Sequence, residues 1–262
     1  MAFALITGAS GGIGWALARE LASRKHDVLL IARSESNLIS HCHELHEKFG
    51  ITAEYLSLDL SIADSALTVR DWLLEKDYGI DILINNAGFG SWGNIKNIER
   101  EELNQMMRLN MLTLADLCKV LLPLLEGHPK SFILNVSSTA SYQAVPTLAT
   151  YAATKAFVLF FSRGLRWDLK ETTVSVSCLS PGSTSTGFMD RAHMSNDLKD
   201  KAEKFNMTPE EVARIGIRGM FAGKAEIIPG LINKVSVALV ELMPKSLPER
   251  IAGNLYKTKK IN

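Results

Sequence analysis

Tyr151 and Lys155 are the two side chains of this sequence best placed for acid–base chemistry, because they lie four residues apart. On a helix this spacing puts both on one face, one turn apart. A free tyrosine has a pKa of about 10, and lowering it to roughly 7 requires about 4 kcal/mol of preference for the phenolate. A fixed ammonium group nearby is the simplest source of that preference. The pair predicts a phenol that can donate a proton near neutral pH.

Ser138 offers a hydroxyl that can reach the same place. It follows an apolar run, Ser131 to Val136, which reads as a strand, and it precedes Tyr151 in the sequence. A hydroxyl at the end of a strand and a phenol at the start of the next helix can converge on one carbonyl oxygen. Ser137 competes with Ser138, but alternation along an extended chain points the two side chains in opposite directions.

These residues also have an ordinary interpretation, since a tyrosine and a lysine often share one face of an amphipathic helix. Tyr142 is a competing phenol, but position 146 is a proline, so no lysine lies one turn after it. The surrounding elements must therefore decide whether Tyr151 is catalytic.

The start of the chain predicts a nucleotide-binding unit. A strand, a glycine-rich turn, a helix and a second strand, Val28 to Ala32, follow one another within about thirty residues, which is the context that a dinucleotide fold requires. Gly8 permits a tight turn, Gly12 lets the backbone approach a pyrophosphate, and Gly14 lets the helix pack closely. The N-terminus of the helix then offers unpaired N–H groups to the anion.

Arg33 indicates which dinucleotide binds. NAD-binding units carry an acidic residue at the end of the second strand to hold the ribose 2′-hydroxyl. Here no acid precedes Glu35, and the planar guanidinium of Arg33 matches a phosphate. We therefore expect NADP(H), the alternative being an ordinary surface arginine.

Two later strands end in polar residues. The strand Ala53 to Leu58 runs into Asp59, which either holds the adenine amino group or caps a helix starting near Ser61, two compatible roles. The strand Asp81 to Ile84 runs into Asn85-Asn86-Ala87-Gly88. These amides can tie neighbouring strands together, and the glycine lets a ribose approach the backbone.

Asn110 is a polar amide inside a long apolar helical stretch, Glu101 to Leu125. A buried amide must find hydrogen-bond partners. Asn110 either satisfies a neighbouring backbone group or holds a water molecule beside the active site.

The last third of the chain carries weaker signals. After the strand Val174 to Leu179, the turn Ser180 to Thr186 should lie over the same end of the sheet. We expect residues 187–225 to form a lid over the substrate, with methionine and phenylalanine for adaptable packing, against the alternative of a plain surface loop. Within that region, Thr208 to Phe221 has the signature of a capped helix. Residues 230–262 predict a helical tail that covers the substrate mouth, packs on a partner subunit, touches a membrane or is simply solvated.

The composition limits the function classes. With 262 residues the chain suits one large α/β domain, 1–262, and a net charge of +1 gives no argument for nucleic acid.

Three scattered cysteines make neither a disulfide framework nor a zinc site, which favours a reducing, cytoplasmic location without a signal peptide. The run Ile227 to Met243 is too interrupted to span a membrane, although peripheral contact stays open. The metal-like cluster His41 to His46 lacks a second ligand pair, so we expect no metal.

The ordered set of motifs resembles the short-chain dehydrogenase/reductase family over about residues 3 to 188. The motifs are Thr7-Gly8-(x)3-Gly12-Ile13-Gly14, Asp59-Leu60, Asn85-Asn86-Ala87-Gly88, Asn110, Ser138, Tyr151-(x)3-Lys155 and Pro181-Gly182. The resemblance implies a doubly wound Rossmann fold with a seven-stranded parallel sheet, and a homodimer or homotetramer. It implies a catalytic tetrad of Asn110, Ser138, Tyr151 and Lys155. It also implies cofactor contacts from Gly8, Ser10, Gly12, Ile13, Gly14, Arg33, Asp59, Leu60, Asn86, Ala87, Gly88, Tyr151, Lys155, Pro181, Gly182, Thr184 and Thr186.

The sequence therefore predicts an NADP(H)-dependent oxidoreductase that reduces an apolar ketone or ketoacyl group to a secondary alcohol, or runs the reverse reaction. A non-catalytic NADP(H)-binding regulator of the same fold is the alternative, and a nucleotide-sugar isomerase is disfavoured by the short sequence after Gly187. Ile227-Ile228-Pro229-Gly230-Leu231 departs from the Gly-rich ending of the acyl-carrier-protein reductases. The ending is more similar to the hydroxysteroid and long-chain ketoacyl reductases.

Overall fold

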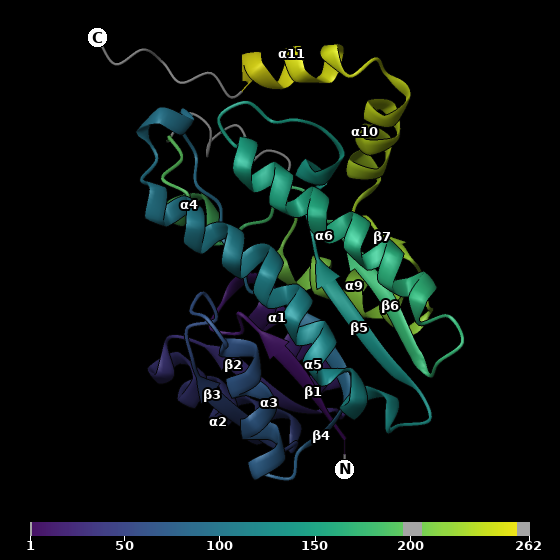
Figure 1. Ribbon diagram of the computed structural model, residues 1–262. Helices are drawn as coiled ribbons and strands as arrows, with labels where there is room; N and C mark the ends of the chain where they lie inside the picture. The colour runs from purple at the N-terminus through teal and green to yellow at the C-terminus, as the bar shows by residue number, and fades with distance from the viewer. Residues whose placement is uncertain (1, 196–205, 256–262) are drawn as a thin grey trace.

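A parallel sheet of seven strands forms the centre of the molecule, which a computed structural model describes over residues 2–195 and 206–255. The strand order is β3-β2-β1-β4-β5-β6-β7, and every neighbouring pair is parallel (Figure 1). The predicted doubly wound fold is confirmed. The strands are β1 Ala2–Thr7, β2 Asp27–Ala32, β3 Ala53–Ser57, β4 Gly79–Asn85, β5 Ser131–Val136, β6 Val174–Leu179 and β7 Glu226–Ile227.

The sheet reverses its winding direction next to β1. The chain runs from β1 outward to β2 and β3, returns to pair β4 with the other edge of β1, and then continues outward to β7. The loops after β1 and β4 therefore diverge at this switch point and leave a crevice at the carboxyl ends of the strands. In open sheets of this kind the crevice is where ligands bind.

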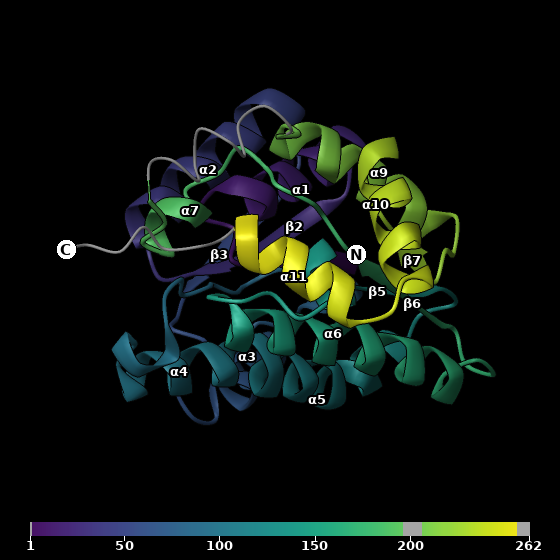
Figure 2. The same cartoon turned by 90° about the horizontal axis from the view of Figure 1, so that it is seen from above.

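Helices cover both faces of the sheet (Figure 2). One hydrophobic cluster joins the sheet to α1, α2 and α9, and the other joins it to α3, α5 and α6. The described helices are α1 Gly12–Ser23, α2 Glu35–Phe49, α3 Ser65–Glu75, α4 Arg100–Met107, α5 Leu114–Glu126, α6 Ala149–Asp168, α7 Phe188–Arg191, α9 Pro209–Phe221, α10 Leu231–Leu242 and α11 Ser246–Leu255, with short turns at Ile95–Asn97 and Thr139–Tyr142 and a π-helical segment at Arg108–Thr113.

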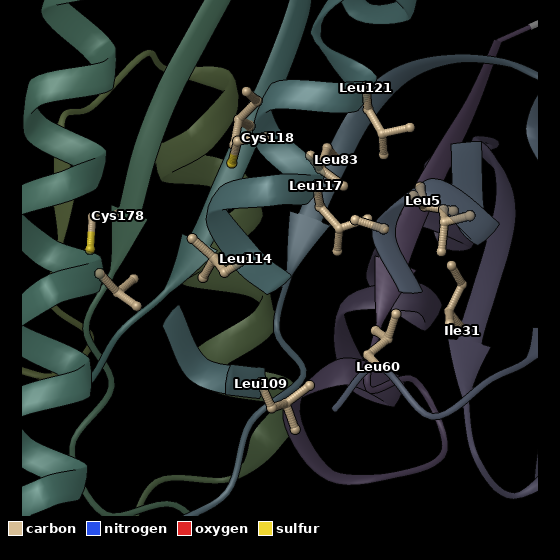
Figure 3. Packing of buried hydrophobic residues seen from close by; sticks show 14 of the residues in the cluster. Leu5, Ile31, Leu60, Leu83, Leu109, Leu114, Leu117, Cys118, Leu121 and Cys178 are labelled. Carbon is tan, nitrogen blue, oxygen red and sulfur yellow. The ribbon is translucent and has the colours of Figure 1, made fainter. Parts of the chain in front are cut away.

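The strands are apolar at nearly every position because both of their faces are buried. Along β1, Leu5 joins the cluster under α3 and α5, whereas the next residue, Ile6, joins the cluster under α1 and α9. Both side chains are fully buried. Figure 3 shows part of the cluster under α3 and α5, including Leu5, Leu83 and Leu117. Each such side chain contributes roughly 1.5–3 kcal/mol by leaving water, so the strand ends that carry the polar residues are rigidly supported.

Two helical segments differ in detail from the sequence prediction. The helical stretch expected from Glu101 to Leu125 is confirmed as α4, a π-helical segment and α5 in direct succession, but the π-helical geometry around the buried Asn110 was not predicted. The helix expected near Ser61 begins at Ser65 instead, with Asp64 at its N-cap position in the left-handed conformation. Asp59 is therefore not a helix cap, and that interpretation of it was wrong.

The region after β6 contains both irregular and helical structure. The capped helix is confirmed as α9, in which the Thr208 hydroxyl accepts a hydrogen bond from Glu211 N and the Glu211 carboxylate accepts one from Thr208 N. This helix packs on α1 across the sheet face rather than over the crevice. Phe205, expected to contribute to the lid, lies outside the described residues.

The tail is helical where it is described. The helices α10 and α11 lie at the top of the molecule in Figure 1. Within residues 2–195 and 206–255, no helix combines the length and apolar character needed to cross a membrane. The basic residues Lys257, Lys259 and Lys260 fall outside the described residues.

Candidate active site

A cavity of about 920 Å³ lies over the carboxyl ends of the strands at the switch point. All the predicted cofactor residues line it, from Gly8 to Thr186, and so do Ser138, Tyr151 and Lys155. Of the predicted site residues, only Asn110 does not reach the cavity wall. The structure thus brings together residues that are up to about 180 positions apart, while their individual roles stay predictions.

The glycine loop has the tight geometry that its sequence requires. Gly8 has a φ of +67°, a conformation that residues with a Cβ atom rarely adopt. A Cβ atom on Gly14 would collide with the carbonyl oxygen of Gly8. No side chain caps the N-terminus of α1 at Gly11, so its first N–H groups are available to an anion in the cavity.

Asn86 fixes the loop after β1 to the loop after β4. Its side-chain amide donates hydrogen bonds to the carbonyl oxygens of Thr7 (2.9 Å) and Gly8 (3.2 Å), and its backbone N–H donates to the Thr7 hydroxyl (3.0 Å). The preceding residue, Asn85, donates to the side chain of Asn135 on β5 at 2.9 Å. The prediction that these amides tie neighbouring strands together is confirmed.

Ser137 and Ser138 have different environments. The Ser137 hydroxyl donates to the carbonyl oxygen of Lys155 at 2.7 Å and so stabilises the start of α6 against β5. The Ser138 oxygen accepts a bond from Ala140 N at 3.1 Å and lines the cavity next to Tyr151. The hydroxyl hydrogen of Ser138 can therefore turn towards a ligand.

Tyr151 and Lys155 lie on one face of α6, one turn apart, as their spacing predicts. The Lys155 ammonium nitrogen is 5.9 Å from the centroid of the Tyr151 ring and donates to the carbonyl oxygen of Val136 at 2.9 Å. Both side chains are buried yet line the cavity. Burial lowers the pKa of Lys155 to about 8, because removal from water disfavours the charged form.

Tyr142 does not compete with Tyr151 as a proton donor. Its hydroxyl donates to the Glu226 carboxylate at 2.6 Å and lies 3.2 Å from the Ser180 hydroxyl. Burial, together with the bond to Glu226, raises the pKa of Tyr142 far above its usual value. This phenol therefore stays protonated and bound to Glu226.

Asn110 satisfies backbone groups on the opposite side of the crevice. Its side-chain oxygen accepts from Phe89 N at 3.1 Å, and its amide donates to Phe89 O at 2.9 Å and to the Thr154 hydroxyl at 3.0 Å. The first of the two predicted roles, satisfaction of a neighbouring backbone group, is confirmed. These bonds connect the π-helical segment to the loop after β4 and to α6.

Arg33 and Asp59 lie side by side at the other end of the cavity. An Arg33 guanidinium nitrogen is 3.8 Å from an Asp59 oxygen. Asp59 also accepts bonds from the backbone N–H (2.8 Å) and the hydroxyl (2.7 Å) of Ser61. Burial raises the pKa of Asp59, but the bonds from Ser61 and the charge of Arg33 outweigh this effect and lower it overall.

Part of the predicted lid lines the cavity. The Phe188 ring lies 5.1 Å from the Tyr151 ring, and Met189 and Met194 also contribute to the wall. Arg191, at the end of α7, lines the cavity as well but was missed by the sequence analysis. Its position three residues after Phe188 was the available signal, because this spacing places both on one helix face.

The tail also contributes to the cavity. Asn233, Ser236, Val237 and Val240 of α10 line its wall. The helix α10 thus forms part of the cavity wall, while the four roles considered for the tail stay predictions. The spacing of these residues, at i, i+3, i+4 and i+7, is that of one helix face and could have identified them. In the described part of the chain, no group of three or more metal-ligating side chains occurs.

Comparisons with known proteins agree with this geometry. The family model for short chain dehydrogenase matches residues 2–197. The chain is 31% identical over 189 residues to the very-long-chain 3-oxoacyl-CoA reductase-B of Danio rerio, a match that covers 70% of this chain and 60% of that protein. It is 28% identical over 238 residues to the very-long-chain 3-oxoacyl-CoA reductase of Mus musculus, covering 89% and 75% of the two chains. A solved short-chain dehydrogenase from Sphingobium yanoikuyae in complex with NADPH has a TM-score of 0.82 at 28% identity, covering 100% of this chain and 98% of that one.

Proposed function

Because the chain belongs to the short-chain dehydrogenase/reductase family, we propose that it is an oxidoreductase that uses NADP(H) to reduce a carbonyl group to a secondary alcohol, or to oxidise the alcohol. The observation that carries the proposal is the convergence of Ser138, Tyr151 and Lys155 with the glycine loop and Arg33 around one cavity. This arrangement combines a proton donor, a hydrogen-bond donor and a dinucleotide cradle.

The size and charge of the cavity support binding of a dinucleotide. Its volume of about 920 Å³ lies at the upper end of the range for ligand sites, which leaves room for a substrate beside the cofactor. The charged residues in its wall are three cations, Arg33, Lys155 and Arg191, and one carboxylate, Asp59. This balance favours a ligand with several phosphate groups. The loop from Gly8 to Gly14 would hold the diphosphate, and Arg33 the 2′-phosphate.

Tyr151, Ser138 and Lys155 would act together on the substrate oxygen. Bound NADPH supplies the hydride that reaches the carbonyl carbon. Ser138 donates a hydrogen bond to the carbonyl oxygen as negative charge grows there, and Tyr151 gives that oxygen its proton. The Lys155 ammonium stabilises the phenolate that remains.

The phenolate must then recover a proton. Lys155 is the nearest acid on α6, one turn from Tyr151. We propose that Asn110 holds a water molecule through which Lys155 exchanges protons with solvent, in addition to the backbone bonds that it makes. The reverse reaction uses the same groups, with Tyr151 as the base that accepts the alcohol proton.

The substrate half of the cavity favours an apolar molecule. Val145 and Leu148 line it from the segment before α6, Phe188 and Met194 from the lid region, and Val240 from the tail. Since the relatives named above are 3-oxoacyl-CoA reductases, we propose a bulky ketone or a ketoacyl thioester as the substrate class.

The Tyr151→Phe variant tests the catalytic assignment. We expect its rate of NADPH oxidation with an apolar ketone or ketoacyl thioester to fall by about 100-fold or more, which is the usual contribution of a positioned proton donor. The matched control is Tyr142→Phe, which removes a phenol from the same cavity wall but should retain most of the activity. Equal activity in Tyr151→Phe and the wild type would refute the assignment. NADPH binding without turnover on a broad carbonyl panel would instead support the regulatory alternative.

The Arg33→Ala variant tests the cofactor assignment. Loss of a guanidinium that binds the 2′-phosphate should weaken NADPH binding by about tenfold or more, because hydrogen bonds to charged groups are worth about 1.5–3 kcal/mol. NADH affinity should change little, since NADH lacks that phosphate. Fluorescence titration of both cofactors measures this, and an equal loss for the two would show that Arg33 does not read the phosphate.

A further inference from the structure

Arg191 is a cation of the cavity wall to which the mechanism above assigns no role. It ends the four-residue helix α7, and the carbon of its guanidinium lies 4.4 Å from the centroid of the buried Phe89 ring. Such a position above an aromatic face orients the planar group as well as attracting it.

The helix that carries Arg191 is anchored at both ends. At its start the Phe188 ring contacts the Tyr151 ring, with centroids 5.1 Å apart. Just after its end the carbonyl oxygen of Ala192, itself fully buried, accepts a hydrogen bond from Trp92 N at 3.1 Å. Arg191 therefore extends from a fixed base and not from a free loop.

Arg191 lines the same cavity as the Arg33–Asp59 pair and interacts electrostatically with both residues. Burial and then the charge of Arg33 lower the pKa of Arg191, while the Asp59 charge opposes this effect. Viewed from above, α7 lies on the same side of the molecule as α2 and β3 (Figure 2). In the sequence, Arg33 lies between β2 and α2, and Asp59 lies just after β3. Two guanidinium groups thus approach one carboxylate from different elements.

The two positive charges of Arg33 and Arg191 are not balanced by the single carboxylate of Asp59. Asp59 is already engaged by Ser61 and approached by Arg33. Arg191 as a residue is exposed and lines the cavity, and among residues 2–195 and 206–255 no hydrogen bond or ion pair holds its guanidinium. A dianion between the two arginines would relieve their repulsion and fill their donor sites, since a guanidinium matches a phosphate with two parallel hydrogen bonds.

We infer that Arg191 binds the 2′-phosphate of the cofactor together with Arg33, so that the phosphate is held from the sheet on one side and from the lid region on the other. The inference rests on the proposed use of NADP(H) and extends it to a residue outside the nucleotide-binding half of the chain. The preference for NADP(H) over NAD(H) would then depend on both arginines.

Binding of two adenosine fragments to the full chain tests the inference. Adenosine 2′,5′-bisphosphate carries the 2′-phosphate without the diphosphate, whereas adenosine 5′-diphosphate carries the diphosphate without the 2′-phosphate. For Arg191→Met we expect calorimetric titration to show about tenfold weaker binding of the 2′,5′-bisphosphate and a change of less than about twofold for the 5′-diphosphate. The affinity of Arg191→Lys for the 2′,5′-bisphosphate should lie between those of Arg191→Met and the wild type, because lysine keeps the charge and loses the planar fork.

Arg70→Met is the matched control, since Arg70 pairs with Asp71 on the exposed surface of α3 and does not line the cavity. Unchanged binding of the 2′,5′-bisphosphate to Arg191→Met would overturn the inference, and so would a loss confined to the 5′-diphosphate. A failure of the NADP(H) proposal would give a different result from a failure of the inference on Arg191. In that case the wild type itself would bind the 2′,5′-bisphosphate no better than adenosine 5′-monophosphate. Thermal unfolding of each variant confirms that it folds.

Discussion

At the scale of single residues, the site depends on an ammonium group that is held out of water. Lys155 is buried, and within the described chain its ammonium group donates a hydrogen bond to the carbonyl oxygen of Val136. A neutral amine would bind that carbonyl almost as well, so the charge of Lys155 is poised to change within the accessible pH range. In the mechanism that we propose, proton delivery through Tyr151 depends on that charge.

Carbonyl reduction should therefore decrease at moderately alkaline pH. Burial lowers the pKa of Lys155 to about 8, so its ammonium is present below this pH and is lost as the pH rises through it. We expect kcat/KM for reduction to fall above about pH 8, well before the ordinary lysine value of about 10.4. The pH profile of NADPH oxidation measures this.

Lys155→Arg provides the control, because arginine stays charged over the whole range. The overall rate of Lys155→Arg will be lower if the longer side chain fits poorly. The fall in kcat/KM with rising pH should nevertheless move to higher pH in this variant. A wild-type profile that stays flat to about pH 10 would contradict the role given to Lys155.

At the scale of elements, the glycine loop joins β1 to α1 by close backbone contact. Gly14 lies against the carbonyl oxygen of Gly8, so the first turn of α1 can approach the strand only without a side chain there. Asn86 completes the contact from β4 by bonding to Thr7 and Gly8. The glycine loop is thus held in place by β1, α1 and the residues after β4 together, and no one of these elements alone would fix its conformation.

Gly14→Ala should disrupt this contact. An added methyl group must displace the Gly8 backbone or the Asn86 side chain, which we expect to lower the free energy of unfolding by about 1–3 kcal/mol and to weaken NADPH binding. Gly11→Ala is the matched control for folding, because no atom lies within 4 Å of its added Cβ atom and its backbone is extended. Urea denaturation measures the free energy of unfolding of both variants. Equal stability of Gly14→Ala and the wild type would contradict the close contact between Gly14 and Gly8.

At the scale of the whole molecule, α6 connects the active site to an outer surface. Its inner face carries Tyr151 and Lys155, and its outer face exposes Phe160 and Trp167, each with 72% of its surface accessible. Large apolar side chains on a surface helix are typical of protein–protein contacts. We propose, as the family resemblance implies, that this face joins two copies of the chain.

Phe160→Glu should shift the assembly towards the monomer. A charge at the centre of an apolar contact costs several kcal/mol if it stays unpaired, so we expect at least a tenfold weaker dimer in sedimentation analysis. Ile39→Glu on α2, which changes a side chain that is 51% exposed on a different face, should leave the mass unchanged. A monomeric wild type, or equal masses for the two variants, would refute the interface.

The sequence alone determined the parts of this protein whose signal is local. Continuous apolar runs gave the buried parallel strands, since a strand covered on both faces cannot alternate. The glycine spacing, the strand-end amides and the pair Tyr151 and Lys155 each report on a few neighbouring residues, and their order along the chain specified the family. The details that were not predicted lie where long-range contacts compete with local preference, as in the π-helical geometry around Asn110, whose side chain bonds to Phe89 and Thr154.

Only the tertiary structure decided which distant side chains meet. The bond that removes Tyr142 from the chemistry joins it to Glu226, 84 residues away, and no local pattern encodes that pairing. Likewise Arg191 and Arg33 line one cavity, and α10 forms part of its wall, only because the segments after β6 return over the carboxyl ends of the sheet. Chemistry carried by residues within one helix turn can be read from spacing, whereas the shape and charge of the cavity arise from segments that folding alone brings together.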